Sequence, residues 1–503
     1  MIKINKNIDK PIYLQVKDKI YELILNGVLP ANTKLPSTRK LAQELGINRN
    51  TVLAAYEELE SKGLLNSHVG IGTFVTEISD LINEETKRGA ERFNWSNHIS
   101  IDYDEYILYS MVQLYKIATH HSYISFGGAI PDERLLPLDL IKRTFNMAVL
   151  EGKENIFNYG PVEGYAPLRE YISMKMNGMG VKVSGKDVFI TSGSQQALEI
   201  SSRILIKPGD YVFTEEPTYT GALSVFSMLK AKIKGIPMQH NGLNIGILVE
   251  SIKRFNPKLI YIIPNYHNPT GIQMSLDKRK EFMSLVDKFN IPVIEDDVCG
   301  DLSYEGELVP PLKALDRKGQ VIYISSWSKI LVPAFRVGWA VVEDDFVREK
   351  FKAIKGFEDV TSNIISQAII HKFCLRGYMK THLNRIKKEY KKRRNIMLEA
   401  IKEFFPESCN FTKPDGGLVI WVRFLDGVNL NDVFEECIKK GILFAPGSLF
   451  YYSRKGFNEL RLGFAPNEEG KIREGISILG QIIKDCIKTG KNQAIRSEYI
   501  PIL

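Results

Sequence analysis

Residues 321–329 read VIYISSWSK, an apolar run that leads directly into serines and a lysine. Further runs of consecutive apolar residues lie in the same part of the chain, at 188–190, 211–213, 259–263, 291–294 and 339–342. Runs that are apolar on both faces are typical of strands buried in a mostly parallel sheet. Because segments of helical pattern separate these runs, the sequence predicts an α/β domain.

Polar clusters follow four of these runs: Thr191 to Ser194, Asn265 to Asn268, Glu295 to Asp297 and Ser325 to Lys329. In open parallel sheets, ligands bind at the carboxyl ends of the strands, so we expect the four clusters to meet in one crevice. A lysine there can form a Schiff base if its surroundings lower its pKa, although a lone lysine after a strand is most often a plain surface residue. Asp296 places a carboxylate at the end of another of these strands. A carboxylate there can stabilise the protonated pyridine nitrogen of a cofactor ring that withdraws electrons.

Near the start of the chain, residues 35–52 read LPSTRKLAQELGINRNTV. This stretch predicts two short helices separated by Gly46, with Asn48 as the N-cap of the second. A helical repeat over 12–24 precedes them, and a hairpin is predicted over 64–75. The second helix of such a pair can enter the major groove of DNA. The spacing alone also allows a small helical bundle whose charges are solvated.

The stretch "LPSTRKLAQELGINRNTVLAAYEELESKGLL…GIGTFV" resembles the winged helix-turn-helix of the GntR family over nearly all of residues 11–76. One departure is Asn48, where the family usually has serine, and both residues cap helices. The resemblance implies a double-stranded DNA operator as partner. It assigns DNA contacts to Arg39 and Arg49, DNA-backbone contacts to Ser37 and Thr51, and the shape of the wing tip to Gly70 and Gly72.

Residues 120–485 resemble the class I aminotransferases, enzymes of pyridoxal phosphate (PLP) fold type I. The matching motifs are SGSQQA at 192–197, EPTY at 216–219, NYHNPTG at 265–271, IEDD at 294–297 and SSWSK at 325–329. The resemblance implies that Lys329 carries PLP as a Schiff base and that Asp296 pairs with the pyridine nitrogen. It also implies that Asn268, before a cis proline, bonds the ring 3-oxygen and that Tyr219 stacks on the ring.

Further residues receive roles from the same resemblance. The cofactor phosphate would be held by Ser194, Gln195, Ser326 and Arg336, and Tyr159 would reach the phosphate of a partner subunit. A homodimer, domain-swapped in some members of the group, is therefore expected. Arg461 would bind the carboxylate of an amino-acid or amine effector or substrate, and Gly128 would lie beside that carboxylate.

Cys299 departs from the family pattern, because relatives commonly have at this position a tyrosine whose hydroxyl bonds the ring 3-oxygen. A thiol is a weak hydrogen-bond donor. We therefore expect a bound cofactor that titrates at higher pH than in relatives, and impaired transamination.

The order of the two modules is that of the MocR/GabR group of GntR regulators. The predicted domains are a winged helix-turn-helix (1–76), a linker (77–120), an aminotransferase-like domain (121–488) and a tail without assigned role (489–503). The main hypothesis is a PLP-dependent, effector-responsive transcriptional regulator of amino-acid, amine or vitamin B6 metabolism, with transamination secondary to regulation. The alternative is an active aminotransferase that transfers an amino group to a 2-oxo acid. A third hypothesis is a sensor of PLP itself.

Composition adds weaker constraints. The net charge of +8 permits contact with nucleic acid without requiring it. The five cysteines form no CxxC pair and no apolar run approaches the length of a membrane span, so we expect a cytoplasmic protein. The eight histidines show no metal-ligand spacing, and we propose no metal site. The basic run at 384–394 predicts an amphipathic helix with a solvated basic face, with an auxiliary DNA contact as the alternative.

Overall fold

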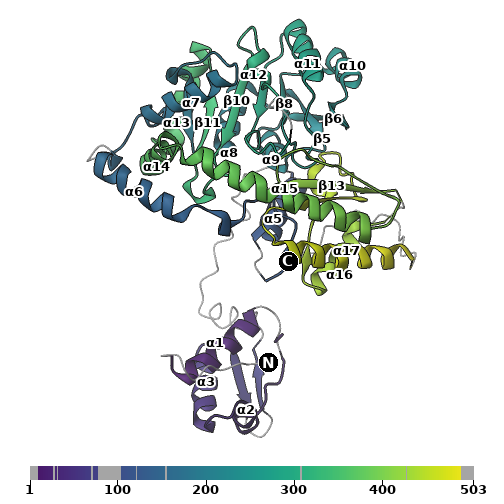
Figure 1. Ribbon diagram of the computed structural model, residues 1–503. Coiled ribbons are helices and arrows are strands. Elements are labelled where there is room, and N and C mark those ends of the chain that lie inside the picture. The colour runs from purple at the N-terminus through teal and green to yellow at the C-terminus, as the bar shows by residue number, and fades with distance from the viewer. Residues whose placement is uncertain are drawn as a thin grey trace. The chain divides into compact units, whose positions relative to one another are not determined.

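Figure 1 shows the computed structural model, which describes residues 10–25, 29–30, 32–68, 72–76, 104–119, 122–152, 156–305, 309–425 and 428–488. The chain divides into two compact units, Met1–Ile101 and Asp102–Leu503. Each unit has its own hydrophobic core. Within the described residues, no helix is both long and apolar enough to cross a membrane.

The described residues of the smaller unit form three helices and a hairpin: α1 (Ile12–Leu25), α2 (Thr38–Leu45), α3 (Arg49–Ser61), β1 (Leu65–His68) and β2 (Gly72–Val75). The two strands pair antiparallel, with Leu65 opposite Val75. Val16, Val52 and Leu59 are completely buried in the core between the helices. The three helices and the hairpin predicted from the sequence are confirmed.

Side chains and one glycine define the turn between α2 and α3. Ser37 Oγ accepts a hydrogen bond from Lys40 N at 3.3 Å before α2, and Asn48 Oδ1 accepts one from Asn50 N at 2.9 Å before α3. These caps satisfy backbone N–H groups that have no partner inside the helix. Gly46 ends α2 in the left-handed region, with a φ of +61°. The predicted N-cap at Asn48 is confirmed.

The larger unit is built on an eight-stranded sheet in the order β4-β11-β10-β9-β8-β5-β6-β7. The five strands from β10 to β6 are parallel to one another, whereas β11 is antiparallel to both of its neighbours. The six predicted strands are all present, and the sequence pattern missed β6 and β7. The bounds are β4 (Val188–Thr191), β5 (Tyr211–Glu216), β6 (Lys232–Gln239), β7 (Gly242–Leu243), β8 (Leu259–Ile262), β9 (Val293–Asp296), β10 (Val321–Ser326) and β11 (Gly338–Val341).

Helices bury both faces of this sheet (Figure 1). In β4, Val188 and Ile190 pack in one hydrophobic cluster, while Phe189 between them packs in another. This two-sided burial explains why the strands are continuous apolar runs rather than alternating ones. The helices are α6 (Leu138–Gly152), α7 (Ala166–Gly178), α8 (Ser194–Leu205), α9 (Thr220–Met228), α10 (Ile245–Phe255), α11 (Leu276–Phe289), α12 (Leu312–Leu315), α13 (Asp345–Asp359) and α14 (Ile364–Leu375).

A smaller lobe completes this unit. Its four-stranded sheet has the order β12-β13-β16-β15, and β14 pairs in parallel with β3, which precedes the large sheet in the chain. The long helix α15 (Tyr378–Phe404) packs against α17 of this lobe (Figure 1). The remaining elements are α5 (Glu105–Thr119), β3 (Ile124–Ser125), β12 (Cys409–Phe411), β13 (Val419–Phe424), α16 (Leu430–Lys439), β14 (Ile442–Leu443), β15 (Ala445–Pro446), β16 (Glu459–Gly463) and α17 (Glu469–Lys488).

The basic run at 384–394 lies within α15, as predicted, but its basic face is not wholly solvated. Arg393 is buried and pairs with Asp132 at 2.7 Å, and Arg394 is buried and pairs with Glu305 at 2.7 Å. The prediction is wrong for these two residues, because acidic side chains from distant segments reach them. They tie α15 to the rest of the unit, which sequence spacing along the helix does not indicate.

Replacing Gly46 by alanine is expected to lower the free energy of unfolding of the smaller unit by about 1 kcal/mol, because alanine resists the left-handed conformation. An added Cβ meets nothing within 4 Å, so the cost is conformational rather than steric. Hydrogen exchange of the amides of α2 and α3 in the full chain measures it. Gly46→Asn serves as the control, since asparagine tolerates this region and should lose less. Unchanged exchange in Gly46→Ala would contradict the left-handed cap.

Candidate functional site

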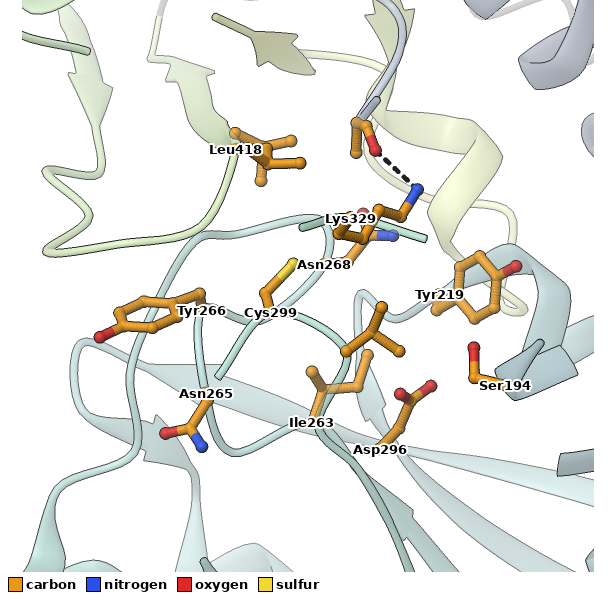
Figure 2. Close-up of a pocket in the computed structure, with 13 residues that line it drawn as sticks. Ser194, Tyr219, Ile263, Asn265, Tyr266, Asn268, Asp296, Cys299, Lys329 and Leu418 are labelled. Atoms are coloured by element: carbon orange, nitrogen blue, oxygen red, sulfur yellow. Dashed lines mark hydrogen bonds between the residues drawn. The ribbon is translucent and has the colours of Figure 1, made fainter. Parts of the chain in front are cut away.

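Four polar clusters meet in one pocket at the carboxyl ends of the strands of the large sheet. The residues that line it include Ser194 after β4, Asn265 and Asn268 after β8, Asp296 at the end of β9 and Lys329 after β10. Figure 2 shows their side chains around one space, with Tyr219 and Cys299. The rest of the lining is apolar apart from Tyr266: Ala129, Ile263, Val298, Leu418 and Val419. The predicted crevice is therefore present.

Lys329 places its amine inside this pocket. Its Nζ donates a hydrogen bond to the Ala129 carbonyl oxygen at 2.7 Å, shown by the dashed line in Figure 2. Burial lowers the pKa of the amine, with the Cys299 thiol acting in the opposite direction and the guanidinium groups of Arg461 and Arg336 lowering it further. A lowered pKa increases the fraction of neutral amine, which is the form that attacks a carbonyl carbon.

Asp296 is only 5% exposed and has one oxygen without a partner. Tyr261 Oη donates to Asp296 Oδ2 at 2.7 Å, whereas Oδ1 has no hydrogen-bond partner among the described residues. Burial raises the pKa of this carboxyl to about 7. A buried acceptor without a donor costs stability, and a protonated ring nitrogen would supply that donor.

The start of α8 forms a cradle for an anion. Arg336 Nη2 donates to the Ser192 carbonyl oxygen at 2.9 Å, and an added Cβ on Gly193 would lie 2.5 Å from that same nitrogen. Gly193 also has a φ of +93°, so the turn requires glycine. Ser326 Oγ accepts a hydrogen bond from Ser328 N at 3.0 Å beside this turn. Backbone N–H groups at a helix start, together with a guanidinium, suit a phosphate group.

Tyr219 and Gln195 form a pair at one side of the pocket. Tyr219 Oη donates to Gln195 Oε1 at 3.1 Å, and Gln195 Nε2 donates to the Gly221 carbonyl oxygen at 3.1 Å. Burial raises the pKa of the Tyr219 phenol to about 12, so the phenol stays protonated at neutral pH. Taken together, the amine, the unpartnered carboxylate, the aromatic ring and the anion cradle fit PLP.

Arg461 lies next to Asn268. The sequence predicts separate roles for them, a carboxylate contact for Arg461 and a contact with the ring oxygen for Asn268. Arg461 Nη1 donates to Asn268 Oδ1 at 2.8 Å, and Nη2 donates to the Gly127 carbonyl oxygen, next to Gly128. Its Nε has no partner among the described residues, and its guanidinium lies 4.7 Å from the centre of the Phe450 ring. Burial lowers the pKa of Arg461 to about 10, so it remains a cation at neutral pH. The Asn268–Pro269 bond is cis, as predicted.

Tyr159 does not lie in the pocket. Its side chain is 83% exposed, on the loop before α7. The other predicted PLP-site residues surround the pocket or the adjoining turns, while Tyr159 faces away from this subunit's core.

The predicted DNA-contacting residues lie at the ends of α2 and α3 and on the hairpin. Ser37, Arg39 and Arg49 are exposed, and Thr51 in the first turn of α3 is half-buried. Arg49 Nε donates to Thr38 Oγ1 at 3.4 Å, which joins the two helix starts. Gly72 begins β2, and Gly70 lies outside the described residues.

Sequence reasoning missed Tyr261 and several apolar residues of the lining. Tyr261 lies in an apolar run and was interpreted as core, although a phenol among aliphatic residues in the strand beside Asp296 was an available signal. Ala129 directly follows the predicted site residue Gly128, although its carbonyl oxygen was not predicted as a partner of Lys329. Leu418 and Val419 come from a segment far from the motifs, so no local pattern indicates them.

Comparison with known proteins identifies both parts of the chain. Residues 130–479 match the family model described as aminotransferase class I and II, and residues 12–75 match that of the bacterial regulatory proteins of the gntR family. The chain is 35% identical to aromatic-amino-acid aminotransferase 1 of Thermococcus litoralis, over 75% of this chain and 91% of the relative. It is 32% identical to the uncharacterized HTH-type transcriptional regulator YisV of Bacillus subtilis, over 93% of this chain and 95% of the relative.

Among solved structures, the chain is similar to the kynurenine aminotransferase of Pyrococcus horikoshii in complex with PMP, the amine form of PLP. The two share 35% identity with a TM-score of 0.72, over 80% of this chain and 99% of that chain. The enzymes cover the larger unit, whereas the Bacillus subtilis regulator covers both units.

Replacing Asp296 by asparagine is expected to change how stability depends on pH in the cofactor-free protein. The folded chain holds the Asp296 proton up to about pH 7, whereas the unfolded chain releases it near pH 3.8. The wild type therefore loses stability relative to Asp296→Asn as pH rises from 4 to 7, by about 1.4 kcal/mol for each pH unit. Denaturant unfolding at a series of pH values, followed by tryptophan fluorescence, measures this difference. A difference that does not vary with pH would contradict the raised pKa.

Proposed function

Since the chain belongs to the aminotransferase class I and II family and carries a GntR-family helix-turn-helix domain, we propose that it is a transcriptional regulator whose DNA binding responds to a ligand of its PLP site. PLP is the cofactor of the larger domain. The observation that carries the proposal is the similarity to a named transcriptional regulator over 93% of this chain, across both domains. A DNA-binding role would place the protein in the cytoplasm.

In the smaller unit, α3 would enter the major groove of operator DNA. Arg49 and Thr51 at its start would reach base edges or phosphates, while Arg39 and Ser37 on α2 would hold the backbone. The exposure of Ser37, Arg39 and Arg49 supports this role, because none of their side chains is used in the core. Gly70 and Gly72 would let the wing approach the DNA closely.

In the larger unit, each polar group would hold one part of the cofactor. When bound, PLP supplies an aldehyde that captures amines and a ring that withdraws electrons. Lys329 would bind the aldehyde carbon, Asp296 Oδ1 would accept from the ring nitrogen, and Asn268 would donate to the ring oxygen. Tyr219 would cover the ring face. Ser194, Gln195, Ser326 and Arg336 would bind the phosphate.

The ligand would be an amino acid or an amine with a carboxylate. Arg461 is a buried cation whose Nε has no partner among the described residues, so its N–H can donate to a ligand carboxylate beside Gly128. One part of the pocket wall is apolar and consists of Ala129, Leu418 and Val419. This wall favours a ligand with an uncharged side chain, since a second carboxylate would be buried there without a cation.

We further propose a homodimer in which Tyr159 reaches the partner subunit's cofactor phosphate. Phe157, two residues before Tyr159, is 61% exposed, and Phe357 and Val360 at the end of α13 are 88% and 59% exposed. The loop that holds Phe157 and Tyr159 lies close to the start of α14, since a Cβ added to Gly160 would clash with the Ile364 side chain. A group of large exposed apolar side chains is typical of a surface covered by another subunit.

A second candidate function is a working aminotransferase. Two observations favour it: an amine and a carboxylate line the pocket, with an arginine and an anion cradle beside them, and a relative of this chain is named as an aminotransferase. Against it stands Cys299, whose buried thiol has its pKa raised to about 12 and is a weak donor. A sensor of PLP alone would differ from both, because its DNA affinity would change with PLP and need no amine.

Arg49→Ala is expected to weaken binding to DNA from upstream of the protein's own gene about 10–100-fold, the range of one lost base or phosphate contact. Lys62→Ala, on the exposed far end of α3, is the matched control and should change affinity less than threefold. Lys329→Ala should keep DNA binding but lose its response to amino acids. Fluorescence anisotropy of labelled DNA, with and without PLP and an amino-acid panel, measures all three.

Different outcomes of that experiment separate the hypotheses. A response to PLP alone would favour the PLP sensor. Sustained conversion of an amino acid and a 2-oxo acid, with no effect of either on DNA binding, would overturn the regulatory proposal.

Cys299→Tyr is expected to lower by about one unit the pH at which the absorbance of the bound cofactor changes, because a phenol donates to the ring oxygen where a thiol does not. Turnover of amino acids should rise. Cys299→Ser is the control, since its short hydroxyl does not extend as far as a phenol. Absorbance titration of the PLP-loaded proteins measures the effect, and an unchanged spectrum together with unchanged turnover would show that Cys299 does not limit the chemistry.

A further inference from the structure

Tyr261 lies in β8 with its side chain completely buried, one strand away from Asp296. Its Oη donates to Asp296 Oδ2 at 2.7 Å. Burial, followed by the charge of Asp296, raises the pKa of the Tyr261 phenol well above 10. The phenol therefore keeps its proton at neutral pH and can donate it to the Asp296 carboxylate.

Asp296 is the middle member of three consecutive buried carboxyls, and its partners differ from those of its neighbours. Glu295 accepts from the backbone N–H groups of Leu312 and Lys313, at 2.7 and 2.8 Å. Asp297 accepts from Asn265 Nδ2 at 2.9 Å and from Tyr323 Oη at 2.8 Å. Both are thus held by groups on two sides, whereas Asp296 is held on Oδ2 and leaves Oδ1 without a partner among the described residues.

We propose that Tyr261 is a positioning residue, which fixes Asp296 as a carboxylate with Oδ1 directed at the ring nitrogen of PLP. The inference rests on the role proposed above for Asp296. A carboxylate can rotate about its terminal bond, and a hydrogen bond to one oxygen fixes where the other lies. The same bond favours the charged form, which is the form that can accept from a protonated ring nitrogen.

Several other groups act on Asp296, and the experiment has to separate them from Tyr261. The Asp297 carboxylate opposes ionisation of Asp296, while the Lys329 ammonium and the backbone N–H of Val298 favour it. Tyr219 and Cys299 are protonated at neutral pH, because burial raises the pKa of each to about 12. The charged and titratable groups that face Asp296 are therefore Tyr219, Tyr261, Asp297, Cys299 and Lys329.

Tyr261→Phe removes the donor and little else, and Tyr323→Phe is the matched control. Both tyrosines are buried, both lie in central strands of the same sheet, and each donates to one of two adjacent aspartates. Loss of the bond to Asp297 makes that group easier to protonate, so Tyr323→Phe should leave the Asp296 pKa unchanged or lower it. Tyr261→Phe should raise it.

The first measurement is the free energy of unfolding of the cofactor-free full chain between pH 5 and 9, by denaturant and the fluorescence of tryptophan. We expect the loss of stability in Tyr261→Phe to increase with pH. The free energy of unfolding falls as pH rises from the unfolded to the folded pKa of Asp296, and a higher folded pKa extends this fall to higher pH. In an Asp296→Asn background, the same substitution should cause a loss that does not vary with pH. A pH-independent loss in both backgrounds would overturn the proposal.

The second measurement is the dissociation constant of PLP at pH 7, from its absorbance. Tyr261→Phe should raise it about tenfold, and Tyr323→Phe less than threefold. Equal effects of the two variants would leave Tyr261 as a core residue and overturn the inference. Asp296→Asn tests the underlying assignment separately: if it leaves PLP affinity unchanged, the proposed role of Asp296 fails, whatever the tyrosine variants do.

Discussion

The larger unit depends on the burial of a carboxyl and an amine at the end of a sheet whose two faces exclude water. Asp296 and Lys329 lie where β9 and β10 finish, and burial moves both pKa values toward the neutral forms. Such groups cost stability when they lack partners. A cofactor that brought a ring nitrogen to Asp296 and an aldehyde to Lys329 would compensate that cost, and its binding would then be coupled to the stability of the unit.

The sequence predicts the site best where polar residues directly follow an apolar run that forms a buried strand. All six predicted strands are present, and the clusters after four of them meet in one pocket because parallel strands end at the same edge. The helix-turn-helix was predictable for a different reason: Ser37, Gly46 and Asn48 act on their own neighbours, so the pattern is local.

What the sequence does not predict depends on contacts between distant segments. β6 was missed because its sequence, KIKGIPMQ, alternates lysines with apolar residues near the edge of the sheet. The contact of Arg461 with Asn268 joins residues 193 positions apart. Arg393 and Arg394 look solvated in a basic run, and only the positions of Asp132 and Glu305 explain their burial. Tyr261 needed the register of β8 against β9 before its hydroxyl could be assigned to Asp296.

The two ends of the cofactor site differ in a way that bears on regulation. At the end proposed to hold the ring nitrogen, Asp296 is buried and accepts from a phenol that keeps its proton, which would favour tight retention of the ring. At the end proposed to hold the ring oxygen, the side chain of Cys299 is a protonated thiol and a weak donor. In this proposal, retention would depend on the first end, and repeated turnover would also need the second. A site strong at one end and weak at the other is suited to capturing an amino acid and holding it, and a regulator can respond only if its ligand favours one of its two states.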